Sequence, residues 1–329
     1  MKIVGLEEHF AIPELIDAWQ ALEPQWQDVG IPVTADDELG RRLVDLDGER
    51  IAAMDETGLD VSVVSMTTPG LQNLEPRDAV ALQGVCNDRL ADAIRRHPGR
   101  LQGFATLATP TPDAAAAELD RAVRELGFNG AMLYGRTRER NLDHRDFWPI
   151  FEAAEALNAP LYLHPQPPPP AVRAAYYSGL GDEVDAALAT HGYGWHYDAG
   201  LQLLRLILGG VLDRFPGLQL ILGHWGEVML FYLDRIDRMT SIAGLDRPVS
   251  DYVRDNVFVT PGGVFSQRYL QWTLDVVGAD RILFASDYPY VMVPDGGSRR
   301  FLDEAAISES DREMIASGNW AKLCAGIRR

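Results

Sequence analysis

Short apolar segments alternate with longer segments of helical periodicity along the whole chain. The apolar segments are rich in β-branched residues, which is typical of strands that are buried on both faces. Eight of them occur, at 3–7, 61–66, 101–107, 130–134, 160–164, 219–223, 256–260 and 281–286. Helical periodicity occurs between and after them, near 47–57, 77–97, 113–126, 147–157, 197–214, 227–239, 265–277 and 309–324.

This alternation predicts an α/β fold, with a parallel sheet covered by helices. Eight such units in 329 residues favour a single domain over residues 1–329 that closes into a (β/α)8 TIM barrel. An open doubly wound sheet is the alternative. It lacks support because no Gly-x-Gly-x-x-Gly motif follows the first apolar segment.

Three connections are too long to be simple turns, and each follows a predicted strand. They lie at 10–46, 165–196 and 288–303, after the first, fifth and eighth strands. Long connections in compact domains are often functional. In a barrel, the loops at the carboxyl ends of the strands form the active site. We therefore expect these three loops to surround the site.

Composition and charge narrow the classes of partner. The formal net charge of −18 argues against nucleic acid and anionic membrane surfaces as partners. No apolar stretch is long enough to span a membrane. Only two cysteines are present, and no secretory signal is visible, which indicates a cytoplasmic protein. Aromatic residues in the first two long loops favour a homodimer or homotetramer, although they could instead cover the site: Trp19, Trp26, Tyr176 and Tyr177.

Residues that can bind a metal occur where the predicted strands end. Glu7 and His9 end the first strand and share a face, because alternate strand residues point the same way. His164, His224 and Asp287 end the fifth, sixth and eighth strands. Imidazoles and carboxylates that converge at one rim are typical of a catalytic metal site. For each histidine taken alone, a hydrogen-bonded structural role is the alternative.

Further polar residues lie near these strand ends. Glu227 follows His224 by three residues, and Arg235 lies further along the same predicted helix. His191 and His196 belong to the loop after the fifth strand and could reach the site, but the sequence leaves their roles open.

The lysine content disfavours one type of metal site. The chain has only Lys2 and Lys322, and its predicted fourth strand ends in Leu133-Tyr134-Gly135. Lys2 opens the first predicted strand and Lys322 lies in the last predicted helix, so both are badly placed to bridge two metal ions.

Several motifs resemble those of the amidohydrolase superfamily. The similarity is to its metal-dependent, non-oxidative decarboxylases of aromatic acids, such as γ-resorcylate, 2,3-dihydroxybenzoate and 5-carboxyvanillate decarboxylases. It extends from Leu6 to Ala321, nearly the whole chain. The specific motifs are Glu7-x-His9, Leu163-His164-Pro165, Leu222-Gly223-His224-Trp225-Gly226-Glu227, Arg235-Ile236-Asp237 and Ser286-Asp287-Tyr288-Pro289.

The resemblance implies a set of site residues. One divalent ion, zinc or manganese, would be held by four residues: Glu7, His9, His164 and Asp287. His224, supported by Glu227, would face the substrate, and Arg235 would contact the substrate's oxygen substituents. Asp287 would deliver the proton, with His224 and Glu227 as the second candidate. No organic cofactor is implied.

The chain departs from its relatives at two places that bear on substrate identity. Tyr134 stands where resorcylate-type enzymes tend to carry Asn, which makes it a candidate substrate-binding residue. The segment 198–202 replaces a Glu-Thr-x-x-His motif that is frequent in relatives.

The expected function is decarboxylation of a small, ortho-hydroxylated aromatic acid, which releases carbon dioxide and a phenol. The alternative is a hydrolase with one metal ion that acts on a lactone or related ester, with Asp287 as base. A barrel that binds a ligand without chemistry is a third possibility.

Overall fold

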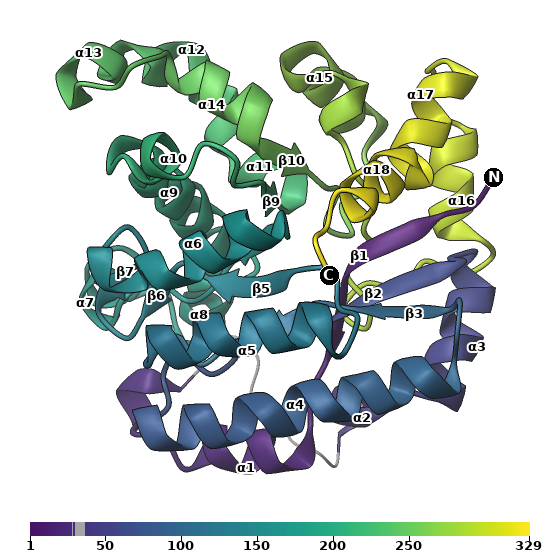
Figure 1. Cartoon of the computed structure of the whole chain (residues 1–329), viewed down its shortest axis with the longest axis horizontal. Coiled ribbons are helices and arrows are strands. Elements are labelled where there is room, and N and C mark those ends of the chain that lie inside the picture. The colour runs from purple at the N-terminus through teal and green to yellow at the C-terminus, as the bar shows by residue number, and fades with distance from the viewer. Residues whose placement is uncertain (28, 30–36) are drawn as a thin grey trace.

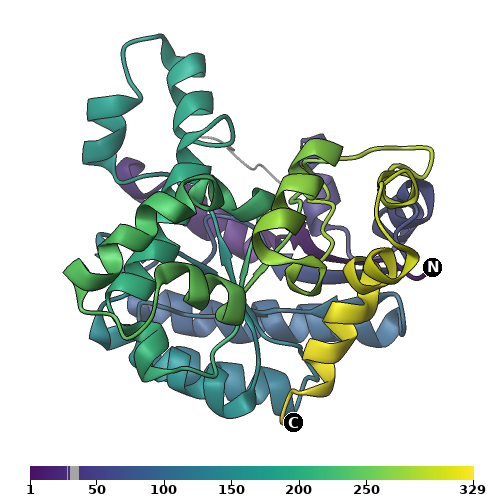
Figure 2. The ribbon, with the colours of Figure 1, turned by 90° about the horizontal axis from the view of Figure 1, so that it is seen from above.

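Parallel strands occupy the inside of the structure, and helices surround them (Figures 1 and 2). The computed structural model describes residues 1–27, 29 and 37–329. Three parallel strands pair in the order β1 (Val4–Phe10), β2 (Val61–Met66) and β3 (Leu101–Gly103). Five more parallel strands pair in the order β10 (Val257–Val259), β9 (Leu220–Leu222), β8 (Leu161–His164), β5 (Ala131–Tyr134) and β4 (Ala105–Thr106).

The edges of these two sheets are linked at two places. β3 and β4 are separated only by Phe104. At the other edges, the segment 281–286 makes isolated parallel bridges to Gly5 of β1 and Val259 of β10. The predicted eighth strand is therefore present as single bridges rather than as a regular strand. β1 shifts its register between Gly5 and Glu8, and such a bulge disrupts a ladder locally.

Helices follow most of the strands. The described helices outside the long connections are α3 (Gly48–Thr57), α4 (Pro76–Arg96), α5 (Pro112–Arg124), α6 (Trp148–Leu157), α9 (Gly194–Leu208), α10 (Val211–Arg214), α14 (Val249–Asn256), α15 (Gln267–Val277), α17 (Glu309–Glu313) and α18 (Asn319–Ala325). Proline near the start and arginine in the last turn suit the ends of α4 and α5.

The long connections contain short elements of their own. Helices lie there or after β9: α1 (Pro13–Gln20), α2 (Glu38–Val44), α7 (Pro170–Tyr176), α8 (Asp182–Ala189), α11 (His224–Glu227), α12 (Leu233–Ile236), α13 (Thr240–Ala243) and α16 (Gly297–Asp303). β6 (Arg136–Thr137) and β7 (Arg140–Asn141) pair as a small antiparallel hairpin. Single turns of other helix types occupy Pro24–Trp26, Arg145–Phe147, Met229–Tyr232, Asp237–Met239, Ala279–Arg281 and Met314–Gly318.

The predicted α/β fold with parallel strands is confirmed. The segment 227–239, predicted as one helix, forms consecutive short turns of 3-10 and α type from Met229 to Met239, and the positive φ angles of Glu227 and Val228 keep these two residues out of them. α14 was not predicted. The described part of the first long loop contains α1 and α2, whereas residues 28 and 30–36 of that loop lie outside the described residues. In the described part of the chain, no helix is long and apolar enough to cross a membrane.

Alternate strand residues pack into two separate apolar clusters. Val61 and Val63 of β2 pack in a small cluster with Leu6 of β1 and Phe104. Val64, the next residue along β2, belongs to the large cluster between strands and helices. The strands are therefore buried on both faces, as their continuous apolar character predicts.

A buried carboxylate links the segment 281–286 to β1. The Glu8 side chain is fully buried, and the N–H and Oγ–H groups of Ser286 donate to its two oxygens at 2.9 and 2.6 Å. Burial raises the pKa of Glu8 to about 7, although these hydrogen bonds oppose the shift. The buried guanidinium of Arg50 donates to the carbonyl of the next strand residue, His9.

The Ser286→Ala substitution should lower the free energy of unfolding by about 1–3 kcal/mol, because one Glu8 oxygen loses its hydroxyl donor inside the protein. Urea unfolding followed by circular dichroism measures the change. Ser178→Ala is the matched control, since its exposed hydroxyl donates only locally to Ala174, and it should change stability by less than about 0.5 kcal/mol. Equal effects of the two substitutions would show that the Glu8 contact does not stabilise the fold.

Candidate active site

A cavity of about 550 Å³ lies at the carboxyl ends of the strands. Its polar lining includes four histidines and one aspartate: His164, His191, His196, His224 and Asp287. Its apolar lining includes Leu39, Trp195, Val264, Tyr290 and Val291. Residues of all three long connections therefore contribute to the walls. The cavity lies where the sequence analysis places the active site, at the carboxyl ends of the strands.

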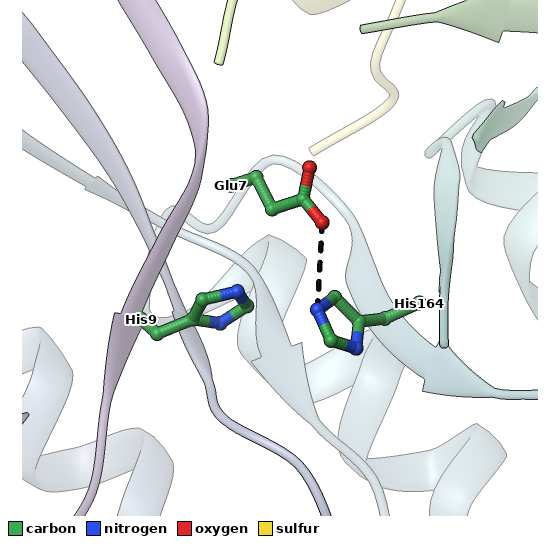
Figure 3. A group of neighbouring side chains, drawn as sticks. All are labelled: Glu7, His9 and His164. Atoms are coloured by element: carbon green, nitrogen blue, oxygen red, sulfur yellow. Dashed lines mark ion pairs between the residues drawn. The ribbon is translucent and has the colours of Figure 1, made fainter. Parts of the chain in front are cut away.

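Glu7, His9 and His164 form one compact group of ligand atoms (Figure 3). Their candidate ligand atoms lie within 4.8 Å of one another, and all three side chains are buried. The Oε1 atom of Glu7 is 3.4 Å from Nε2 of His164, and Nε2 of His9 is 3.3 Å from Oδ1 of Asp287. The structure thus brings together the four residues that the resemblance implies as metal ligands.

This group has the chemistry of a metal site. Two ligands on a tetrahedral ion with bonds of about 2.0–2.1 Å lie about 3.3 Å apart, close to the separations seen here. Within the described residues, Oε1 of Glu7 and both ring nitrogens of His9 are buried without a hydrogen-bond partner, which is costly unless another group binds them. Nδ1 of His164 donates to the carbonyl of Pro165 at 2.7 Å. In the neutral ring, Nε2 then carries no proton, and its lone pair can bind a metal ion.

The two histidines of this group are in the protonation state that binds a cation. Burial lowers the pKa of His9 to about 4 and that of His164 to about 3, because the charged ring loses its hydration. Both rings are therefore neutral at neutral pH, as metal ligation requires. The residues present fit a divalent cation.

Tyr162 forms a hydrogen bond with Glu7, and the sequence analysis did not identify it as a site residue. Its hydroxyl donates to Oε2 of Glu7 at 2.5 Å and contacts the hydroxyl of Thr260 at 2.8 Å. Tyr162 lies two positions before His164 on β8, so both face the same side of the strand. The strand period could therefore have identified it.

Asp287 is held in an unusual conformation beside His9. Its φ angle is +65°, in the left-handed region that residues other than glycine rarely adopt. Burial raises the pKa of Asp287 to about 7, so this carboxyl exchanges a proton close to neutral pH. A cation bound next to it would favour the ionised form.

His224, Glu227 and His196 form a second group on the same cavity. Nδ1 of His224 donates to Oε1 of Glu227 at 2.7 Å, and Nδ1 of His196 donates to Oε2 at 2.8 Å. Burial alone would lower the pKa of His224, but the carboxylates of Glu227 and Glu7 outweigh it and raise that pKa. Burial alone would raise the pKa of Glu227, but the two imidazoles lower it.

The backbone around His224 is tightly constrained. His224, Trp225, Glu227 and Val228 all have positive φ angles, and such residues tend to occur at functional sites. Gly262, after β10, packs directly against the His224 ring: a Cβ atom at Gly262 would lie 2.8 Å from Cδ2 of His224. The short segment therefore presents His224 in one orientation.

Two predicted substrate-binding residues are not in the cavity lining. The hydroxyl of Tyr134 donates to the carbonyl of Met66 at 2.6 Å, and its ring packs 5.6 Å from that of His164. Arg235 is exposed on α12, because the break at Val228 redirects the chain. Their contact with substrate stays a prediction.

The structure also places the two histidines whose roles were open. His191 is exposed and lines the cavity, with Nδ1 3.4 Å from the hydroxyl of Thr190. His196 lies in the first turn of α9 and contacts Glu227. No spacing in the sequence indicates that contact, because it depends on how α9 packs against the segment after β9.

Comparison with known proteins identifies the family. The sequence profile of the amidohydrolase family matches residues 16–323. This chain belongs to the amidohydrolase family. The resemblance stated from the sequence motifs is therefore confirmed.

Three similar proteins illustrate this membership of the amidohydrolase family. γ-Resorcylate decarboxylase from Polaromonas sp. (strain JS666) is 33% identical over 335 residues, which cover 97% of each chain. The structure of 5-carboxyvanillate decarboxylase from Sphingomonas paucimobilis aligns with a TM-score of 0.90 at 30% identity, over 99% of both chains. 5-Carboxyvanillate decarboxylase from Novosphingobium aromaticivorans, complexed with manganese and 4-hydroxy-3-methoxy-5-nitrobenzoic acid, aligns with a TM-score of 0.89 at 32% identity, covering 98% of this chain and 96% of that chain.

The substitution His9→Ala should lower the affinity of this amidohydrolase for manganese or zinc by more than about tenfold, because it removes one of the neutral imidazoles of the compact group. Mass spectrometric metal analysis after dialysis measures the bound ion per chain. His144→Ala is the control, since His144 is exposed and pairs only with Asp146 among the described acidic residues. Retention of stoichiometric metal by His9→Ala would contradict the assignment.

Proposed function

We propose that this chain is a metal-dependent, non-oxidative decarboxylase of a hydroxylated aromatic acid, which releases carbon dioxide and a phenol. The observation that carries the proposal is the group of Glu7, His9 and His164 beside Asp287 on an open cavity. The similarity to γ-resorcylate and 5-carboxyvanillate decarboxylases supports it. These relatives do not favour the alternative of a lactone hydrolase, and a complete ligand set argues against a barrel without chemistry.

We propose that the strands close into a (β/α)8 barrel that forms a single domain over residues 1–329. The succession of β3 and β4 across Phe104 supports closure on one side. The bridges from the segment 281–286 to β1 and β10 support it on the other side. In such a barrel, the cavity with its histidines lies on the catalytic face.

We propose Glu7, His9, His164 and Asp287 as the ligands of one manganese or zinc ion. When bound, the ion would supply positive charge that holds the carboxylate of the substrate and its ortho oxygen. The chain itself supplies the shape of the site. Trp195, Val264 and Tyr290 form apolar walls that fit the faces of an aromatic ring and exclude water from it.

Asp287 is the proposed proton donor. When carbon dioxide leaves an aryl acid, the electron pair of the broken bond stays on the ring carbon, and a proton must take the place of the carboxylate. Asp287 lines the cavity, and burial, which raises the pKa of its carboxyl, opposes the ionisation that a bound cation favours. His224, oriented by Glu227, is the second candidate, and its positive charge also suits an anionic substrate.

We propose that the protein self-associates as a homodimer or homotetramer. Large apolar side chains are exposed on the turns after β9 and on α7: Ile242 is 81% exposed, Tyr176 78% and Phe231 70%. Exposed apolar groups of this size are typical of protein–protein contacts. Arg235 belongs to the same stretch of chain. The low cysteine content supports a cytoplasmic location, and the charge of −18 supports the absence of nucleic-acid and membrane partners.

The proposed reaction is tested with manganese- or zinc-loaded enzyme and a panel of ortho-hydroxybenzoates in D₂O. We expect carbon dioxide release and deuterium at the ring carbon that lost its carboxylate, detected by NMR. Asp287→Asn should lower kcat by at least about 100-fold, because its amide is not an acid, and metal analysis separates this effect from metal loss. Hydrolysis of lactones with no decarboxylation of any acid would contradict the proposal.

Self-association is tested by sedimentation of the wild-type protein and of a Phe231→Glu/Ile242→Glu variant. We expect the variant to sediment as a smaller species, because charged side chains are costly in a buried contact. Val85→Glu is the matched control, since Val85 is exposed on α4, outside this stretch of chain. A wild-type protein that sediments as a single chain would rule out self-association.

A further inference from the structure

A buried carboxylate between two imidazoles is the feature that the proposed reaction does not yet explain. Glu227 is 1% exposed, and each of its oxygens accepts from a different histidine: Oε1 from His224 and Oε2 from His196. The two imidazole rings lie with centroids 4.5 Å apart. Both histidines line the cavity, so the group forms part of its wall.

A second metal ion is a poor explanation for this group. Its three candidate ligand atoms are close enough together to be considered. However, the nitrogen–oxygen separations are 2.7 and 2.8 Å, which are hydrogen-bond distances. Ligands on one tetrahedral ion would lie about 3.3 Å apart. The atoms of this group therefore satisfy one another, unlike those of Glu7 and His9.

His196 is the only hydrogen-bond donor to Oε2 of Glu227 in the part of the chain that the structure describes. Its other ring nitrogen, Nε2, faces the carbonyl of His191 at 3.1 Å. The ring thus lies between the Glu227 carboxylate and the backbone carbonyl of His191. Without it, a buried carboxylate oxygen would lose its donor, which is costly, and the carboxylate would be free to rotate away from His224.

Helix α9, which carries His196, also packs against the backbone of Glu227. Gly200 lies one turn after His196, and a Cβ atom there would lie 2.4 Å from the carbonyl oxygen of Glu227. The absence of a side chain lets the helix approach the strained segment 224–228 closely. The helix, the glutamate and His224 are therefore in direct contact with one another.

We propose that His196 is a positioning residue: it holds Glu227 in place, and Glu227 in turn holds the His224 ring with Nε2 directed at the substrate. This inference rests on the proposed decarboxylation. His196 need not touch the reacting atoms, because its effect passes through the carboxylate. Small displacements of an oriented group are sufficient to lower a rate substantially.

Three substitutions separate positioning from simple packing. In His196→Asn the amide nitrogen can occupy the place of Nδ1 and donate to Glu227. In His196→Gln the amide lies further out, where Nε2 was, and reaches His191 rather than Glu227. His196→Leu removes both ring nitrogens, including the donor to Glu227. The exposed His144→Asn serves as the matched control.

We expect His196→Leu and His196→Gln to lower kcat by about 10- to 100-fold, with KM changed less than about threefold. His196→Asn should recover most of kcat, and His144→Asn should equal the wild type. All variants should keep their bound metal, since the group of Glu7, His9 and His164 is intact. Equal losses in the Asn, Gln and Leu variants would overturn the inference.

A proton NMR measurement tests the same point without any turnover. The hydrogen-bonded Nδ1–H of His224 should give a downfield resonance that persists in His196→Asn and shifts or broadens in His196→Leu. An unchanged resonance in His196→Leu would overturn the positioning role. If the wild-type protein decarboxylates no acid but this resonance responds as expected, the proposed function fails while the positioning of His224 stands.

Discussion

Two consecutive carboxylates are buried in the first strand, and the rest of the site depends on how they are paired. Glu7 and Glu8 are both fully buried, and strand alternation sends them to opposite sides of β1. A buried carboxylate needs donors or a cation. Glu8 takes its donors from Ser286, which fixes the last strand segment and the position of Asp287. Glu7 takes one donor from Tyr162 and leaves Oε1 for a cation.

The surroundings of the imidazoles at this site shift their pKa values in opposite directions. Burial dominates at His9 and His164 and lowers their pKa values, so these rings are neutral, as metal binding requires. At His224 the carboxylates of Glu227 and Glu7 outweigh burial and raise the pKa, so this ring carries a positive charge. One pKa unit corresponds to about 1.4 kcal/mol of preference for one protonation state. A ring must be neutral to bind a cation, so these opposite shifts decide which rings can bind one. Glu7 acts on all three rings, so the main difference is Glu227, which accepts a hydrogen bond from His224.

The sequence predicted those features that depend on local periodicity. The positions of the parallel strands, and the meeting of Glu7, His9, His164 and Asp287 at their ends, follow from strand alternation and from the direction of parallel strands. Tyr162 was within reach of the same reasoning. The contact of His196 with Glu227 was not, because it depends on the packing of α9.

Arg235 shows where local periodicity fails. Its segment has a helical pattern, but positive φ angles at Glu227 and Val228 interrupt the chain there, and residues 229–239 form short 3-10 and α turns instead of one regular helix. These angles are maintained by tertiary contacts, such as Gly200 against the carbonyl of Glu227, and no residue type in the segment signals them. A pattern of apolar positions therefore predicted a continuous helix where the site requires a strained turn.

A chain with a formal charge of −18 is a poor general partner for an acid, so local charge must decide whether a carboxylate enters this cavity. Asp287 and His224 line it, Glu7 and Glu227 lie beside His224, and His224 supplies one opposing positive charge. When all three acids are ionised, the side chains alone leave the site negative. A divalent cation held by Glu7, His9, His164 and Asp287 would cancel that excess. Binding of an aromatic acid would then follow binding of the metal, because Glu7, Glu227 and Asp287 would repel the acid where no cation offsets their charge.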